Sequence, residues 1–465
     1  METNKVEREK LEKKYKDVIE VNKLLNRKIV SFQANKKIPF YRWFAFKEGF
    51  SSQMVNLFIK DYPKKSGTVL DPFFGSGTTL FSSREMGFNS YGIEIMPIGE
   101  FVLESRIAAE NVDLDYLIDA IEKIKKLNFI KLPTDEKTNY KHIAITECAF
   151  PADTEHKLNA FLNYIETLPS DENVKQLFKF ACFCILEKIS YTRKDGQYLR
   201  WDYRSKKTRS KFDKGKIYSF EDAFFGQLDQ MIFDIRNMKL FAGNQQNNNH
   251  HIEFKTGSCL EILPTLKTES FDLIISSPPY CNRYDYTRTY ALELVFLGLD
   301  QEDIKKLRQN LLTCTVENKE KVEFLKSIYR QNDQSDLFHM AEKSFNSNKA
   351  LQEVLEILNI YKEDKKLNNP GIYGMVKNYF YEHTFVVFEM ARVLKKGGKI
   401  YYVNDNVKYA GEVIPVDLIL SEFASDAGLK VKKIFKLGSG KGNSSQQMGA
   451  HGREELRKCV YLWEK

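Results

Sequence analysis

The sequence predicts an α/β protein with a doubly wound, mostly parallel sheet of seven strands and two large insertions. From Gly67 to the C-terminus, apolar runs typical of strands alternate with helical patterns. The first run leads into a turn with two glycines and then into a helix, the connection expected at the end of a parallel strand. Two further segments are too long to be simple connections, which identifies them as insertions.

Each predicted strand is a short apolar run, and helical patterns fall between most of them. Helices are expected from Ser51 onward and at residues 78–86, 385–394 and 414–427, the last ending before Gly428. No long crossover separates the final two strands, so we expect the last strand to be antiparallel. The seven strands are predicted at residues 68–71, 90–95, 251–255, 271–276, 399–404, 429–437 and 458–463.

The same patterns divide the chain into a core and added segments. Residues 1–37 are expected to hold an amphipathic helix over 5–28, because side chains from Leu11 to Leu25 recur at three- and four-residue spacing. Residues 107–250 are the candidate DNA-binding insertion, and the second insertion is helical in pattern. The core is predicted at 38–106, 251–298 and 373–465, and the insertions at 107–250 and 299–372.

Composition and cysteine usage predict a cytoplasmic protein. Of the 465 residues, 42% are apolar, which is enough for a sizeable core. No uncharged apolar run reaches the roughly 18 residues of a membrane helix, and the charged N-terminus lacks the apolar stretch of a signal peptide. The seven cysteines form no CxxC pair, which fits a reducing compartment and predicts no metal site.

Residues 188–216, which we call the basic ribbon, hold eleven Lys and Arg against three acids, with five aromatic residues among them. This composition favours binding to a phosphate backbone, because each neutralised phosphate releases a condensed counterion. The alternative is a solvated basic face on an insertion. The candidate DNA contacts in the ribbon are Arg193, Lys194, Arg200, Arg204, Lys206, Lys207 and Arg209.

The segment DPFFGSGTTL, residues 71–80, predicts a ligand site at the end of the first strand. Its glycines permit close approach of a ligand, and the helix that follows offers unpaired N–H groups to an anion. Leu80 replaces the third glycine of a dinucleotide loop and no P-loop lysine is present, so a carboxylate such as the methionine end of S-adenosylmethionine fits better than a pyrophosphate. Glu94 ends the next strand, where an acid can accept both ribose hydroxyls. The candidate ligand contacts are Asp71, Pro72, Phe73, Gly75, Gly77, Thr78, Thr79 and Glu94.

A second motif, SSPPY at residues 276–280, follows the apolar run FDLII. Its prolines fix φ and remove N–H donors, which leaves carbonyls free to accept. If the Ser277 hydroxyl and the Pro278 carbonyl accept both hydrogens of a nucleobase amine, the amine lone pair can point at an electrophilic methyl group. Tyr280 would then stack on a base rotated out of the duplex. The candidate catalytic residues are Ser277, Pro278, Pro279 and Tyr280.

Together the two motifs resemble the cofactor loop and the catalytic loop of the S-adenosylmethionine-dependent DNA amino-methyltransferases of restriction–modification systems. Residues 50–58 are similar to the cofactor-covering helix of that family, which adds Ser51 to the cofactor contacts, and residues 394–405 are similar to its fifth strand. The resemblance implies a Rossmann-like methyltransferase fold, S-adenosylmethionine as cofactor and a flipped base in double-stranded DNA as substrate. A separate restriction endonuclease is an expected partner.

One position departs from the family pattern. The third strand usually leads into Gly-Asp, whose acid binds the adenine amine of the cofactor, whereas this chain has Gly257-Ser258. The contact is then weaker, comes from Ser258, or is supplied elsewhere. Serine before Pro-Pro-Tyr resembles the cytosine-N4 enzymes more than the adenine-N6 enzymes, which favours cytosine. An RNA base methyltransferase and a catalytically silent nucleic-acid-binding protein are the alternatives.

The segment after the catalytic loop supplies further candidate DNA contacts. Arg283, Tyr284 and Arg288 are positioned in sequence to clamp a phosphate or to fill the space left by a flipped base. The alternative for each is an interaction within its own domain. The polar loop at Asn443 to Ser445 is another candidate contact with DNA.

Overall fold

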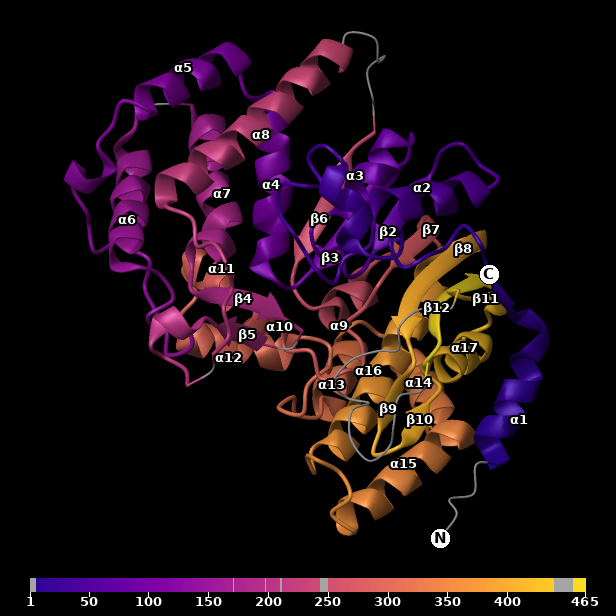
Figure 1. The fold of residues 1–465 in the computed structure, drawn as a ribbon. Coiled ribbons are helices and arrows are strands. Elements are labelled where there is room, and N and C mark those ends of the chain that lie inside the picture. The colour runs from indigo at the N-terminus through magenta and orange to yellow at the C-terminus, as the bar shows by residue number, and fades with distance from the viewer. Residues whose placement is uncertain (1–5, 170, 197, 210, 243–249, 439–454) are drawn as a thin grey trace.

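The computed structural model describes residues 6–169, 171–196, 198–209, 211–242, 250–438 and 455–465. Within these residues, a mostly parallel sheet of eight strands forms the centre of the protein (Figure 1). Its strand order is β1-β11-β12-β8-β7-β2-β3-β6. The candidate loop at Asn443 to Ser445 lies outside the described residues.

The seven predicted strands are all confirmed. The last of them, β12, runs antiparallel to both of its neighbours, as the missing crossover predicts. The central pairs, β7 with β8, β2 with β7, β2 with β3 and β3 with β6, are parallel. The strands are β2 (Thr68–Asp71), β3 (Asn89–Glu94), β6 (Ile252–Thr256), β7 (Phe271–Ser276), β8 (Leu394–Asp405), β11 (Lys430–Lys436) and β12 (Lys458–Glu464).

An eighth strand, β1 (Ile19–Val21), pairs in parallel with β11 at the edge of the sheet. The prediction of one helix over residues 5–28 is therefore wrong beyond α1 (Val6–Tyr15). α1 buries Leu11 and Tyr15, which lie at helical spacing. After α1 the open edge of β11 offers unpaired main-chain groups, and pairing with them overrides the helical pattern.

The predicted core helices are present, and one of them is longer than its pattern indicates. α16 (Ile372–Val393) begins well before the predicted start at residue 385, because its upstream half is buried against the second insertion. The Ser51 hydroxyl accepts a hydrogen bond from the Met54 N–H and so caps its helix, as predicted. The other core helices are α2 (Ser52–Asp61), α3 (Thr78–Glu85) and α17 (Val416–Asp426).

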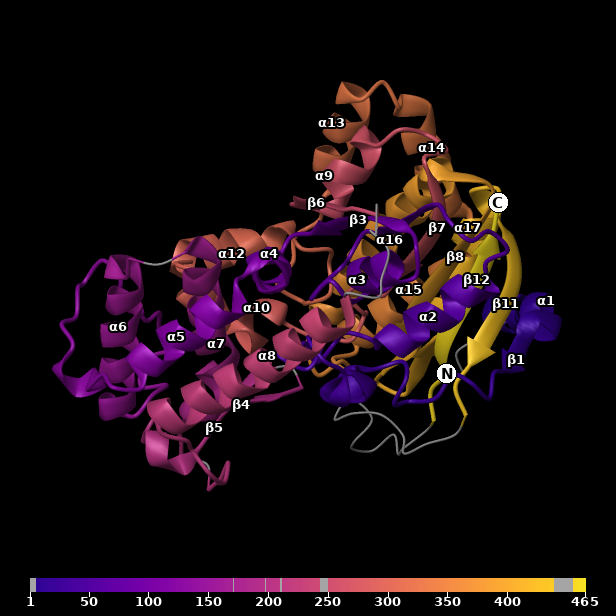
Figure 2. The same ribbon diagram turned by 90° about the horizontal axis from the view of Figure 1, so that it is seen from above.

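Helices cover both faces of the sheet, because consecutive residues of its central strands point to opposite sides. Leu70 and Ile274 pack with α16 and α17 on one face. Val69 and Leu273 pack with α2 on the other face. Figure 2 shows the curved sheet between these helices. The loops that follow β2, β3 and β7 are thereby brought together at the carboxyl edge of the sheet.

The first insertion lies to one side of the sheet and has an apolar core of its own (Figure 1). Phe161, Phe178 and Phe224, from three different helices, are fully buried there. α4 (Pro97–Asn111) packs against α7 and joins this unit to the core. Its elements are α5 (Leu114–Ile124), α6 (Ala152–Thr167), α7 (Glu172–Ile189), the hairpin of β4 (Thr192–Asp195) and β5 (Tyr198–Trp201), and α8 (Phe220–Ala242).

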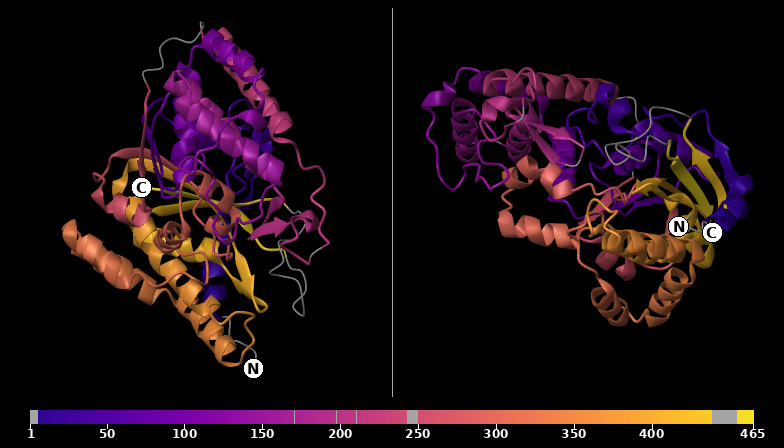
Figure 3. Two further views of the ribbon diagram at one scale, coloured as in Figure 1. Left: turned by 90° about the vertical axis from the view of Figure 1, so that its left-hand side faces the viewer. Right: turned by 60° about the horizontal axis from the view of Figure 1, so that its bottom comes forward.

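The second insertion is built from helices in its described residues. α13 to α15 pack around α16 and lie away from the first insertion (Figure 3). α12 instead contacts α10 (Tyr286–Thr289). None of the described helices is both long and apolar enough to cross a membrane. The helices are α12 (Gln301–Asn310), α13 (Val322–Gln331), α14 (Ser335–Ser347) and α15 (Lys349–Glu363).

Candidate active site

The turn between β2 and α3 places main-chain groups at the edge of a pocket. Gly75 and Gly77 both adopt positive φ, 56° and 77°, a region that side chains disfavour. A Cβ on Gly75 would lie 2.9 Å from Cε1 of Phe46. The Phe74 N–H donates to the Ile93 carbonyl at 3.1 Å, which fixes the turn against β3. Glycine is therefore required at position 75 both for the backbone and for the packing of Phe46.

Asp71, at the end of β2, links the glycine turn to the catalytic loop. It is 1% exposed, and its carboxylate accepts hydrogen bonds from the Ser276 hydroxyl at 2.6 Å and from the Phe73 N–H at 3.0 Å. Burial raises the pKa of Asp71 to about 6, against the opposing effect of these hydrogen bonds. The carboxylate thus holds the ends of two parallel strands in register.

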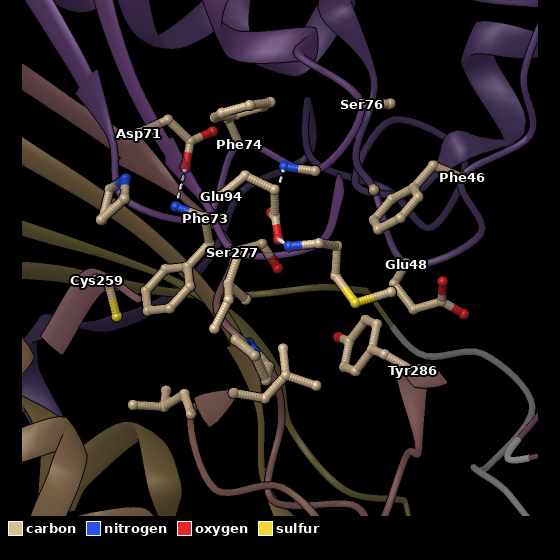
Figure 4. Close-up of a pocket in the computed structure, with 18 of the residues that line it drawn as sticks. Phe46, Glu48, Asp71, Phe73, Phe74, Ser76, Glu94, Cys259, Ser277 and Tyr286 are labelled. Carbon is tan, nitrogen blue, oxygen red and sulfur yellow. Dashed lines mark hydrogen bonds between the residues drawn. The ribbon is translucent and has the colours of Figure 1, made fainter. Parts of the chain in front are cut away.

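Glu94 occupies the position at the end of β3 that the sequence predicts for a ribose-binding acid. Its two oxygens accept hydrogen bonds from the Gly75 N–H at 2.9 Å and the Met96 N–H at 2.8 Å. Burial raises the pKa of Glu94 to about 7. The same side chain therefore borders the pocket and positions the glycine turn (Figure 4).

The catalytic loop after β7 separates two hollows. Ser277 and Pro279 line the first, the glycine-loop pocket, together with Gly75 and Glu94. Pro278 and Tyr280 line the second, which we call the hairpin cleft because Tyr198 of the β4–β5 hairpin also borders it. Successive residues of one short loop thus face opposite spaces. This is the arrangement expected of a loop that stands between a methyl donor and its acceptor.

Side chains outside the predicted motifs complete the pocket. Glu48 and Tyr286 border both hollows, and Figure 4 shows them together on one side of the pocket, opposite Phe73. Phe46 and Glu48 lie in an aromatic stretch of the sequence just before the helix that Ser51 caps. That stretch is the sequence feature from which these two residues could have been predicted. Leu312, which follows α12, also lines the pocket, and no pattern in the second insertion indicates it.

Some predicted cofactor residues shape the pocket without lining it. Ser51, Gly77 and Thr79 are absent from its wall. The Ser51 hydroxyl donates to the Ile29 carbonyl at 2.6 Å, and the Thr79 hydroxyl donates to the Ile275 carbonyl at 3.4 Å. Ser258 does line the pocket, and its hydroxyl donates to the Asn310 carbonyl at 3.3 Å. The residues of the predicted set that border the pocket are Asp71, Pro72, Phe73, Gly75, Thr78, Glu94, Ser258, Ser277 and Pro279.

Part of the basic ribbon is engaged in internal contacts. Lys194 is 5% exposed, forms an ion pair with Glu293 and lies 4.5 Å from the centre of the Tyr290 ring. Arg204 pairs with both oxygens of Asp202, at 2.7 and 2.8 Å. We therefore assign Lys194 and Arg204 to the packing of the insertion, because moving either to DNA would leave a carboxylate without its partner.

The remaining candidate DNA contacts differ in their surroundings. Arg288 forms ion pairs with Asp285 at 3.2 Å and with Glu317. These pairs are the interaction within the protein that the sequence analysis gave as the alternative to a DNA contact. Arg283 donates to the Asn368 side chain at 3.3 Å. Lys207 donates to two carbonyls and Arg200 pairs with Asp195, while both side chains stay partly open to solvent. Arg193, Lys206 and Arg209 are also exposed.

The fold and the pocket define a class, the Rossmann-like methyltransferases, in which a glycine turn and a strand-end acid border the cofactor. Comparison with known proteins identifies the family within it. A family model described as DNA methylase matches residues 1–98. The chain is 47% identical to the Type II methyltransferase M.AvaI of Nostoc sp. over 98% of its own length and 92% of the relative. It is 42% identical to M.BsoBI of Geobacillus stearothermophilus over 99% of its length and 92% of that relative. No solved structure matches the chain.

The chain therefore belongs to the DNA amino-methyltransferases of restriction–modification systems. Its cofactor is S-adenosylmethionine, its substrate is DNA, and it methylates DNA at specific sites. The pocket suits that cofactor. Glu94 would hold the ribose hydroxyls with its carboxylate, and Phe73, Ile95 and Leu312, which also line the pocket, would offer apolar surface to the adenine. When bound, the cofactor supplies an electrophilic methyl group on a sulfonium.

Proposed function

We propose that this chain methylates the N4 amine of cytosine bases that have been rotated out of duplex DNA. The observation that carries the proposal is the placement of SSPPY between the two hollows, with a serine ahead of the prolines. Serine at this position resembles the cytosine-N4 enzymes. The base would enter from the hairpin cleft, where Pro278 and Tyr280 lie.

The hydrogen bonding of Ser277 supports its role as an acceptor. Its hydroxyl donates to the Tyr280 hydroxyl at 3.1 Å, so the lone pairs of its oxygen are left for an amine hydrogen. Burial raises the pKa of Tyr280, which keeps the Tyr280 hydroxyl protonated. With the Pro278 carbonyl accepting the second hydrogen, the amine nitrogen can become pyramidal and attack in line. Catalysis then rests on positioning and electrostatics, and the proton leaves after the transfer.

We assign the DNA surface to the hairpin cleft and to the exposed part of the basic ribbon. Arg193, Lys206 and Arg209 lie in the same insertion as the hairpin that borders the cleft. Cations in this position would hold the phosphates while the target base reaches the catalytic loop.

The identity of the methylated base tests the proposal directly. DNA from cells that express the chain is digested to nucleosides and analysed by mass spectrometry, with DNA from cells expressing Ser277→Ala as the control. N4-methylcytosine that appears only with the active chain is the expected result. N6-methyladenine in its place would overturn the choice of cytosine, and the absence of any modified base would favour a catalytically silent DNA-binding protein.

We also propose that a separate endonuclease cleaves the site that this chain modifies. The proposal is supported by the printed names of its relatives, which are Type II methyltransferases. DNA modified to completion by the chain should resist that endonuclease and stay sensitive to nucleases with other sites. Equal cleavage of modified and unmodified DNA would contradict the pairing.

A further inference from the structure

The hairpin cleft joins the first insertion to the catalytic core. Pro278 and Tyr280 border it from the catalytic loop, and Gly196 and Tyr198 border it from the β4–β5 hairpin. Side chains from the segment around Ser31 also line it. A substrate that reaches the catalytic loop through this cleft therefore passes the hairpin.

Tyr198 is an exposed aromatic side chain on a firmly anchored hairpin. It is the first residue of β5, pairs with Asp195 across the hairpin and is 55% exposed. Leu199, the next residue, is 4% exposed and belongs to the apolar core of the insertion. On the paired strand, Lys194 is fixed by its ion pair with Glu293. Alternation along the strands thus buries one side of the hairpin and leaves Tyr198 at the cleft.

An enzyme that extrudes a base must offset the loss of pairing and stacking in the duplex. An aromatic ring can stack on the neighbouring bases, because every base has a π face. Two of the three residues first considered for this task are engaged elsewhere: Tyr284 is 8% exposed, and Arg288 pairs with Asp285 and Glu317. Tyr198 borders the same cleft as the catalytic loop and keeps its ring accessible.

We propose that Tyr198 enters the duplex at the target position and stacks in the place of the extruded base. This proposal rests on the proposed function, since it assumes that the chain acts on a flipped base. Arg193 and Arg200 are exposed and pair with each other across the same hairpin, and they would contact the phosphates beside the insertion point. The hairpin then couples binding of the duplex to delivery of the base.

The first test measures extrusion of the base and not activity. 2-Aminopurine replaces the target base in a duplex, and its fluorescence rises when it leaves the stack. We expect the rise seen with the unaltered chain to fall about fivefold with Tyr198→Ala and to be kept with Tyr198→Phe, which retains the ring. Tyr203→Ala is the matched control, because Tyr203 is 51% exposed in the same ribbon and does not line the cleft. An undiminished rise with Tyr198→Ala would overturn the proposal.

The second test separates extrusion from a structural role. Single-turnover methylation is compared on a normal duplex and on one with an abasic site opposite the target base. Tyr198→Ala should lower the single-turnover methylation rate about tenfold on the normal duplex. On the abasic duplex, where the target base is already unpaired, it should lower the rate about twofold or less. Equal slowing on both duplexes would overturn the proposal. A failure of the proposed function is distinct, because the unaltered chain would then methylate another base or none.

Discussion

The two loop motifs, residues 71–80 and 276–280, and the basic ribbon were all indicated by sequence, but by different kinds of evidence. The loops are defined by position, because each follows a buried strand and its residues must lie at the sheet edge. The ribbon is defined by composition, which does not say what each cation contacts. In the structure, Gly75, Glu94 and Ser277 border one pocket, whereas Lys194 and Arg204 pair with internal acids. A motif at a strand end therefore locates a site more closely than a charge count does.

The largest effect is expected from a side chain at the glycine turn. Gly75→Val should abolish measurable binding of S-adenosylmethionine, because a β-branched residue is strained at positive φ and its Cβ meets Phe46 at 2.9 Å. Isothermal titration calorimetry measures the binding. Gly226→Val is the control, since a Cβ there has open space in α8, and it should bind normally. Normal binding by Gly75→Val would separate the glycine turn from the cofactor site.

The next largest effect is expected at the catalytic loop. Ser277→Ala should lower kcat by about 10²- to 10³-fold, comparable to the loss of one charge-stabilising hydrogen bond in other active sites. KM for DNA should change by less than about threefold, because the hydroxyl acts on the reacting amine. Single-turnover and steady-state kinetics measure the two effects. An equal loss in kcat and in DNA affinity would assign Ser277 to DNA binding.

The basic ribbon should show a smaller effect that depends on exposure. Replacing exposed Lys206 and Arg209 by Ala should reduce the slope of log affinity against log salt by about one unit per lost phosphate contact. Arg204→Ala should leave that slope unchanged and lower the melting temperature, because it removes the partner of buried Asp202. Fluorescence anisotropy over a range of salt concentrations and thermal melting test both. If only Arg204→Ala changed the slope of log affinity against log salt, Arg204 would be a DNA contact and Lys206 and Arg209 would not.

The smallest effect concerns the ionisation of Glu94. Its pKa is raised to about 7, so the carboxyl is largely protonated below that pH and ionised above it. The ribose hydroxyls donate to the ionised form, so cofactor affinity should rise about fourfold from roughly pH 6.5 to roughly pH 8. Calorimetry measures the rise, and Glu94→Gln should bind more weakly with a flatter pH dependence. A fourfold rise that persists in Glu94→Gln would contradict the assignment to Glu94, because Asp71, whose pKa is raised to about 6, is already mostly ionised at the lower pH.

Much of the core was predictable because its signals are local. Seven strands, the antiparallel last strand and the cap at Ser51 all follow from short apolar runs and their flanking residues. β1 was missed because its stability comes from the edge of β11, more than 400 residues away in the chain, as the pairing of Ile19 with Ile434 shows. The pocket residues Glu48, Tyr286 and Leu312 were missed for the same reason, since each reaches the pocket only through packing.

The sequence by itself determined the family and placed the glycine turn and the Pro-Pro corner at the ends of two parallel strands, because each needs particular residues at particular positions. Tertiary structure decided which cations stay exposed, which side chains complete the pocket and where Tyr198 stands relative to SSPPY. These depend on which surfaces meet after folding. Lys194 is buried in an ion pair with Glu293, whereas Tyr198 lines the cleft. Lys194 and Tyr198 nevertheless lie in one short basic segment of the sequence.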